Sequence, residues 1–287
     1  MSKKILLTGA SGGFGQLIAK DLVGKGHHVV GTMRSKTGSK AAIADELQQA
    51  GIHVVEMDVT KDQSVLDGVA EATQLMGGLD IVINNAGLGV MGMQEHFTPE
   101  DLKYLFDVNV FGVHRVNRAA LPQLRQQGSG MLIYISSLLG RITLPFYGPY
   151  NASKWALEAL AENYRTELSG FGIHSYIVEP GGYPTTFMDN LMRPSDNSRT
   201  EAYGEFMNAP KSMFDGFEQA LHNNPEQRPE KVAEAVSHLI ELPANERPFR
   251  TVVDSMGMGD HVKGYNENLD QITKGIYSAF GMEGMLG

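Results

Sequence analysis

The sequence predicts an α/β fold in one domain, with a doubly wound parallel sheet of about seven strands and helices on both faces. Short apolar runs alternate with longer amphipathic segments along most of the 287 residues. The apolar runs are nearly unbroken, which is typical of strands that are buried on both faces. Several amphipathic segments end at glycine, the usual stop signal of a helix. These observations favour parallel strands joined by right-handed helical crossovers.

The expected strands are rich in β-branched and aliphatic residues and are too short to form helices. We expect them at 3–8, 27–33, 52–57, 79–84, 130–136, 172–179 and 248–254.

The expected helices are the amphipathic segments between these runs. They lie at 15–26, 41–51, 65–77, 99–128, 151–172 and 229–242. In the last of them, Pro229 occupies the first turn, where its missing N–H costs no helical hydrogen bond.

Two segments fall outside this alternation. Residues 186–226 form a long insertion with a polar middle and apolar flanks, and we expect it to act as a lid over the substrate. Residues 255–287 form a C-terminal extension that is rich in Gly and Met, with one helix expected near 266–279. We find no linker that would divide the chain into two domains.

The composition limits the function classes. The 24 Lys and Arg against 33 Asp and Glu give a net charge of −9 without any charged run, which argues against nucleic acid or an anionic membrane as a partner. The chain has no cysteine, so a thiol nucleophile and thiolate metal ligands are excluded. No pair of histidines flanks a carboxylate at helical spacing, so we expect no catalytic metal. With no signal peptide and no membrane-length apolar run, a cytoplasmic protein is expected.

A glycine-rich loop, TGASGGFG at 8–15, follows the first expected strand and opens the first expected helix. Its glycines Gly9, Gly13 and Gly15 would let the backbone turn sharply and approach a pyrophosphate at the helix N-terminus. An ordinary tight turn also contains glycines, but the position inside the first βαβ unit is the one that a Rossmann dinucleotide site requires.

The end of the second strand indicates which dinucleotide binds. A site specific for NAD places an acidic residue there, whereas a 2′-phosphate needs a cation. This chain has Met33 and then Arg34 and Lys36, with no Asp or Glu before Asp45. The sequence therefore predicts NADP(H), with Arg34 on the 2′-phosphate and Ser11 assisting, although a solvated basic loop would look the same.

The segment YGPYNASK at 147–154 places Tyr150 and Lys154 four residues apart, which puts them on one face of a helix. Such a pair is common on helix surfaces, so the spacing alone does not indicate catalysis. Tyr147 lacks this relation to Lys154.

Seven features occur in the order and at the spacing of the short-chain dehydrogenase/reductase family, which this chain resembles over roughly residues 3–255. They are TGASGGFG, MDV (57–59), NNAG (84–87), Asn109, YISS (134–137), YNASK (150–154) and PGGYPT (180–185). Within the family, the chain looks most like the hydroxysteroid and retinol dehydrogenases.

The resemblance implies four catalytic residues. Tyr150 would move the proton, and Lys154 would favour its phenolate and hold the nicotinamide ribose. Ser137, thirteen residues before Tyr150, would hydrogen-bond the substrate oxygen. Asn109 would distort its helix and hold a water that links Lys154 to solvent. Ser136 would point away and brace the loop.

The resemblance also implies a set of residues that contact the cofactor. They are Gly9, Ser11, Gly13, Phe14, Gly15, Arg34, Asp58, Val59, Asn85, Ala86, Gly87, Tyr150, Lys154, Pro180, Gly181 and Thr185.

The substrate is indicated only by class. Apolar residues flank the motifs, so we expect a small apolar carbonyl compound or alcohol, although such residues more often form core. They are Val90, Met91, Met93, Leu138, Leu139, Phe146, Tyr147, Tyr183, Phe187 and Met188.

Two other functions remain open at this stage, a non-redox epimerase or dehydratase and an NADP(H)-sensing binding protein. The resemblance further implies a homodimer or homotetramer, formed through the helix that carries Tyr150 and the helix before it.

Overall fold

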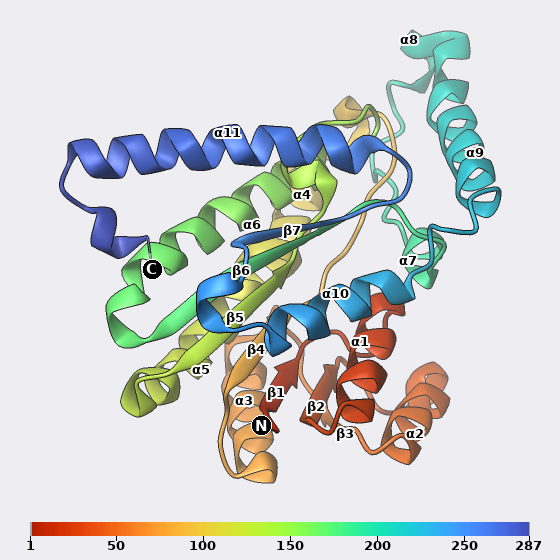
Figure 1. Cartoon of the computed structure of the whole chain (residues 1–287). Coiled ribbons are helices and arrows are strands. Elements are labelled where there is room, and N and C mark those ends of the chain that lie inside the picture. Colours follow the sequence, from red (N-terminus) through yellow and green to blue (C-terminus); the bar gives the residue numbers. More distant parts are fainter. Residues whose placement is uncertain (1, 287) are drawn as a thin grey trace.

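A computed structural model describes residues 2–286 and contains one parallel sheet of seven strands in the order β3-β2-β1-β4-β5-β6-β7 (Figure 1). The predicted fold class is confirmed. The order changes direction between β1 and β4, and ligands of such sheets bind beyond the carboxyl ends of the strands at this point.

Each predicted strand is present, with its ends moved by one or two residues to where the backbone pairing begins and stops. The strands are β1 (Lys4–Leu7), β2 (His28–Met33), β3 (His53–Glu56), β4 (Ile81–Asn84), β5 (Gly130–Ile135), β6 (Ile173–Pro180) and β7 (Arg250–Val253). In the register, Leu7 pairs with both Gly31 and Ile83, so the ends of the three central strands are level.

Helices cover both faces of the sheet. One layer contains α1 (Gly13–Gly24), α2 (Ala41–Gln49) and α10 (Glu230–Glu241), and the other contains α3 (Asp62–Met76), α5 (Gly112–Gln127) and α6 (Gly148–Glu167). Successive residues of a strand face opposite sides. Ile5 and Leu7 accordingly belong to the core under the first layer, and Leu6 belongs to the core under the second.

The long helix predicted at 99–128 is interrupted. It consists of α4 (Pro99–Phe106), a π-helical turn η3 (Asp107–Phe111) and α5. Thr98 begins α4 with a capping box, in which its hydroxyl accepts from the Asp101 N–H and the Asp101 carboxylate accepts from the Thr98 N–H. A π turn inserts an extra residue and often marks a functional position.

The insertion contains α7 (Thr186–Asp189), α8 (Thr200–Tyr203), a 3₁₀ segment η6 (Gly204–Asn208) and α9 (Ala209–His222). Figure 1 shows α8 and α9 projecting beyond the carboxyl end of the sheet. The first part of the insertion pairs with the loop after β4 through an isolated parallel β-bridge between Val90 and Met192.

The C-terminal helix α11 (Met258–Ala279) is longer than the helix expected at 266–279. It begins after Gly257, whose φ of +91° suits glycine, and the Gly259 N–H donates to the Asp254 carboxylate. This hydrogen bond satisfies one backbone N–H group in the first turn of α11. The Gly- and Met-rich sequence did not reveal that the helix begins this early.

Short 3₁₀ segments complete the secondary structure. They are η1 (Gly38–Lys40), η2 (Gln94–His96), η4 (Leu138–Gly140), η5 (Ser169–Phe171), η7 (Ala244–Glu246) and η8 (Glu283–Met285). Within residues 2–286, no helix has the length and apolar character needed to cross a bilayer.

Candidate active site

The glycine loop joins β1 to α1 and allows close backbone approach. Gly9 has a φ of +70°, and a Cβ atom on it would lie 2.8 Å from Ala86 Cα. A Cβ on Gly15 would overlap the Gly9 carbonyl oxygen. Only glycine fits either position, and the loop brings the first N–H groups of α1 to the carboxyl end of the sheet. The cradle therefore fits a dinucleotide pyrophosphate.

Thr8 and Asn85 hold this loop in place. The Thr8 hydroxyl accepts from the backbone N–H of Asn85 at 3.0 Å and of Ala86 at 2.9 Å. The Asn85 side chain donates to the carbonyls of Thr8 and Gly9 at 2.9 and 3.1 Å. Sequence reasoning missed Thr8, although it is the first residue of the motif TGASGGFG. The described geometry makes Asn85 a brace of the loop, and its predicted contact with a cofactor stays a prediction.

Two further predicted cofactor residues, Thr185 and Phe14, adjoin this cradle. A Cβ on Gly13 would overlap Thr185, so these two residues are adjacent, and the Phe14 ring packs edge-on against Tyr183 at 5.6 Å. Val59 is buried beside Gly112 of α5, and Ser11 lies partly exposed on the loop.

Arg34 is exposed directly after β2, where a 2′-phosphate would lie. The positive charge of Arg34 acts on the carboxylate of Asp58, which follows β3. Burial acts to raise the pKa of Asp58, but hydrogen bonds from Thr60 together with the charges of Arg34 and Lys61 lower it. Lys36 contributes its backbone N–H to Glu56 at 2.7 Å. Arg34 is therefore an exposed cation at the position predicted for a 2′-phosphate, and its contact with a cofactor stays a prediction.

Tyr150 and Lys154 lie in the first two turns of α6, which starts at Gly148 with Pro149 in its first turn. Both side chains are buried, at 8% and 5% exposure. The Lys154 Nζ atom donates to the Ile135 carbonyl at 2.8 Å and lies 5.6 Å from the centre of the Tyr150 ring. The predicted shared face is confirmed.

Burial dominates the pKa values of this pair. Burial raises the pKa of Tyr150, and a hydrogen bond with Ser137 only partly opposes this. Burial also lowers the pKa of Lys154 to about 8, although Glu158 raises it. Desolvation therefore favours the neutral phenol of Tyr150 over the phenolate. A neutral phenol is the form that donates a proton.

Ser137 and Ser136 follow β5 and face opposite ways, as predicted. The Ser137 hydroxyl accepts a hydrogen bond from the Leu139 N–H at 3.1 Å and so caps the N-terminus of η4. The same hydroxyl lies against the Tyr150 hydroxyl. The Ser136 hydroxyl instead donates to Glu158 at 2.7 Å.

Asn109 sits at the centre of the π turn and is 1% exposed. Its Oδ1 accepts from the Leu88 N–H at 2.8 Å, and its Nδ2 donates to the Leu88 carbonyl at 2.9 Å and to the Ser153 hydroxyl at 3.0 Å. A Cβ built on Gly87 would lie 3.6 Å from the Asn109 Oδ1 and 3.8 Å from the Lys154 Nζ. Asn109 and Lys154 therefore flank the same glycine. The predicted distortion of the helix is present, and the water relay stays a prediction.

An apolar cluster adjoins Tyr150. It comprises Val90, Phe97, Leu105 and Tyr150, with Leu88, Leu102, Leu139, Phe187 and Met192 packed against it. The Phe187 ring of the insertion lies 5.9 Å from the Tyr150 ring. Val90, Leu139 and Phe187 were predicted here. Phe97, Leu105 and Met192 were missed, because no motif marks them.

Of the other seven residues expected beside the site, Met91, Met93, Leu138, Phe146 and Tyr147 are not part of this cluster, and Tyr183 and Met188 lie elsewhere. Tyr183 belongs to the core under α1 and α10, where its hydroxyl donates to the Val253 carbonyl at 3.2 Å. Met188 lines a cavity beside the glycine loop, together with Gly13 and Lys20. Tyr183 turns into the core beneath α1, and Met188 faces the glycine loop although the adjacent Phe187 faces Tyr150.

A family profile described as short chain dehydrogenase matches residues 3–196. The chain belongs to the short-chain dehydrogenase family. The predicted resemblance is confirmed, and with it the class of protein, an oxidoreductase of this family.

Particular relatives agree with this assignment. The chain is 32% identical to a 3-ketodihydrosphingosine reductase of Bacteroides thetaiotaomicron, over 87% of both chains. A 3-ketoacyl-(acyl-carrier-protein) reductase from Brucella melitensis, solved with NADH, has a TM-score of 0.73 at 25% identity, covering 90% of this chain and 98% of that one. An alcohol dehydrogenase from Thermococcus sibiricus, solved with 5-hydroxy-NADP, has a TM-score of 0.67 at 27% identity, covering 87% and 95%. Nicotinamide cofactors of both kinds thus occur among its relatives.

Proposed function

We propose that this protein is an NADP(H)-dependent oxidoreductase that interconverts an apolar ketone or aldehyde and its alcohol. The observation that carries the proposal is the buried Tyr150 with Ser137 at its hydroxyl and Lys154 beside its ring. Tyr150 is also a member of the apolar cluster that contains Val90, and Phe187 packs against this cluster.

The chemistry follows from these side chains. A bound nicotinamide supplies or takes up the hydride. Tyr150 donates its proton to the carbonyl oxygen during reduction, and Ser137 hydrogen-bonds the same oxygen as negative charge develops on it. The Lys154 ammonium stabilises the phenolate that remains, and Asn109 would hold a water through which a proton returns from solvent by way of Lys154.

The apolar substrate class is supported by the residues around Tyr150. Val90 and Leu105 are buried, and Phe187 from the insertion covers the Tyr150 ring. A hydrophobic carbonyl compound would replace the Phe187 contact, so residues 186–226 serve as a lid in this proposal.

Absorbance at 340 nm tests the function directly. Purified protein is mixed with NADPH and a panel of apolar ketones and aldehydes that includes 3-keto lipids, aryl ketones and retinal. Stoichiometric loss of NADPH supports the proposal. No loss with any compound, combined with product isomers or dehydrated products, would instead support a non-redox activity on the same site.

Arg34→Ala tests the cofactor preference. Hydrogen bonds to charged groups contribute about 1.5–3 kcal/mol, so we expect about a 10- to 150-fold loss of NADPH affinity. NADH affinity should change little, because NADH has no 2′-phosphate. Fluorescence titration of both cofactors measures the ratio. An unchanged NADPH-to-NADH ratio would contradict the assignment of Arg34.

The proposed homo-oligomer forms through α6 and the helix before it. Two large apolar side chains on these elements are exposed, Phe111 at 52% and Trp155 at 39%. We expect Trp155→Glu to convert the oligomer to a monomer in light scattering, because an interface does not tolerate an unpaired charge. Tyr265→Glu on α11 introduces the same charge at a similarly exposed residue and serves as the control. A monomeric wild type, or dissociation by Tyr265→Glu alone, would overturn this interface.

A further inference from the structure

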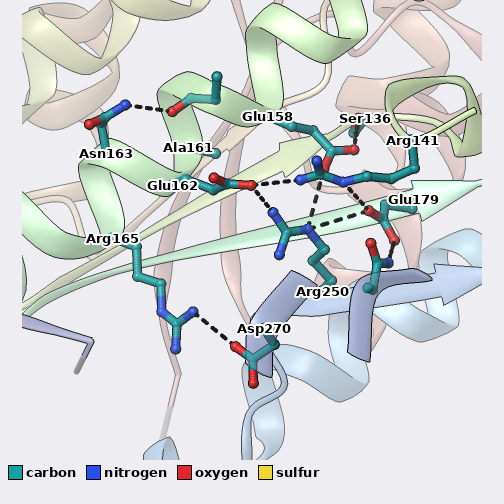
Figure 2. A network of polar contacts seen from close by, with 12 residues as sticks. Ser136, Arg141, Glu158, Ala161, Glu162, Asn163, Arg165, Glu179, Arg250 and Asp270 are labelled. Carbon is teal, nitrogen blue, oxygen red and sulfur yellow. Dashed lines mark hydrogen bonds and ion pairs between the residues drawn. The ribbon is translucent and has the colours of Figure 1, made fainter. Parts of the chain in front are cut away.

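The end of β6 and the loop after it lead into the insertion and carry three of the predicted cofactor residues. They are Pro180, Gly181 and Thr185. The strand itself ends in a buried polar cluster (Figure 2), where the Glu179 Oε1 atom lies 3.5 Å from Arg141 Nε and 3.6 Å from Arg250 Nε. Asn266 of α11 donates to the other Glu179 oxygen at 2.6 Å. The end of β6 is therefore fixed, and the contacts of the next residues set the path of the loop.

Gln227 follows the insertion in sequence and is only 2% exposed. Its Nε2 atom donates to the Gly182 carbonyl at 2.6 Å and to the Asp254 carboxylate at 3.2 Å. Its Oε1 atom accepts from the Ser255 N–H at 2.7 Å. This fixes the orientation of the amide, because a backbone N–H can only donate and a carbonyl can only accept. One buried side chain thus joins the loop after β6, the end of the insertion and the turn between β7 and α11.

The two glycines of the loop lie in close contact with their surroundings. A Cβ on Gly181 would overlap the Asp254 carboxylate, which also accepts from a backbone N–H in the first turn of α11. A Cβ on Gly182 would overlap the Phe217 ring of α9. Gly182 is therefore held between the Gln227 amide and an aromatic ring, and only a residue without a side chain allows both to approach it.

The hydrogen bond from Gln227 to Gly182 also closes the base of the insertion, because the two residues are 45 positions apart in the chain. A lid that opens for substrate would otherwise pull on the loop after β6, since the two segments are continuous. With the base closed, the insertion can rearrange while Gly181 and Gly182 stay in place.

We propose that Gln227 is a positioning residue for the nicotinamide half of the cofactor. Its amide fixes the Gly182 carbonyl and, with it, the backbone of residues 180–185, which ends at Thr185 beside Gly13 of the dinucleotide cradle. The role of Gln227 rests on the nicotinamide cofactor of the proposed function and does not depend on which substrate is turned over.

The test compares two ligands that share an adenosine half with a 2′-phosphate. NADPH and 2′,5′-ADP, which lacks the nicotinamide, are titrated by calorimetry into the wild type, Gln227→Met and Gln227→Glu. Met matches the length of Gln without its amide, and Glu keeps the acceptor for Ser255 but loses both donors. We expect both variants to bind NADPH about 3- to 10-fold more weakly, the usual effect of a lost hydrogen bond, and to bind 2′,5′-ADP as the wild type does.

Gln127→Met is the matched control. The Gln127 Nε2 atom also donates to two backbone carbonyls, those of Leu79 at 2.9 Å and Ser129 at 2.7 Å, but these precede β4 and β5 at the opposite end of the sheet. Both ligands should bind this variant as they bind the wild type. Melting temperatures identify the folded variants, and either Gln227 variant decides the question alone. An unchanged NADPH affinity, or equal losses for NADPH and 2′,5′-ADP, would overturn the proposal.

The proposed function can fail separately. If NADPH binds but no carbonyl compound is turned over, the oxidoreductase assignment fails, while the two affinities still decide the role of Gln227. If the wild type prefers NADH, the NADP(H) preference fails, and the same comparison is made with NADH and AMP. A wild type that binds neither dinucleotide would overturn the role of Gln227 as well.

Discussion

Tyr150→Phe is expected to lower kcat by about 10²- to 10⁴-fold, the usual contribution of a positioned general acid. The change deletes one hydroxyl from a side chain that is 8% exposed and leaves the ring to pack against Phe187. The fold and NADPH affinity should therefore be retained. Turnover is measured at 340 nm under saturating NADPH, and NADPH binding is measured by fluorescence titration.

Tyr147→Phe is the matched control, because it removes the same hydroxyl from a buried tyrosine three residues earlier. Tyr147 precedes α6 and lies outside the face that Tyr150 shares with Lys154. We expect this variant to keep turnover and at most to alter which substrate is preferred. Equal losses in the two variants would mean that Tyr150 has no special role in proton transfer.

Ser137→Ala is expected to lower kcat by about 10²- to 10³-fold, as removal of one donor to a developing oxyanion does. The Ser137 hydroxyl accepts one backbone hydrogen bond, from Leu139, so the cost in stability should be small. Steady-state kinetics and the melting temperature are measured together. A kcat that stays near that of the wild type would remove Ser137 from the reaction.

Ser136→Ala gives the contrasting result. This hydroxyl donates to the buried Glu158 carboxylate and faces away from Tyr150. We expect kcat at pH 7 to fall much less than in Ser137→Ala, because the Ser136 hydroxyl is bonded to Glu158 and does not face the reacting oxygen. The opposite ranking of the two variants at pH 7 would reverse the roles of the two serines.

Much of the candidate site could be predicted because its relations are local along the chain. Tyr150 and Lys154 share a face by helical spacing, and Ser136 and Ser137 point apart by strand alternation. The glycine loop and the strands are equally local, and the structure confirms both. Local spacing did not reveal that η3 would interrupt the helix at 99–128, where Asn109 bonds the backbone of Leu88.

Other expectations depended on contacts between distant segments. Tyr183 and Met188 were expected in the substrate pocket. Tyr183 instead packs in the core beneath α1 and α10, and Met188 lines the cavity beside the glycine loop. The proton on Tyr150 is a second case. Spacing places Lys154 one turn from Tyr150, but the burial that raises the pKa of Tyr150 comes from contacts between distant segments.

The sequence by itself determined the parallel sheet, the dinucleotide cradle and the shared face of Tyr150 and Lys154, because each follows from backbone periodicity within a short segment. Only the tertiary structure decided the burial of that pair and the partners of Glu158. Arg141 pairs with Glu158, and Arg250 pairs with Glu179. Arg141, Glu179 and Arg250 lie far apart in the chain and meet only when β5, β6 and β7 pair. Electrostatic free energy depends on distances through space, and no spacing along the chain encodes them.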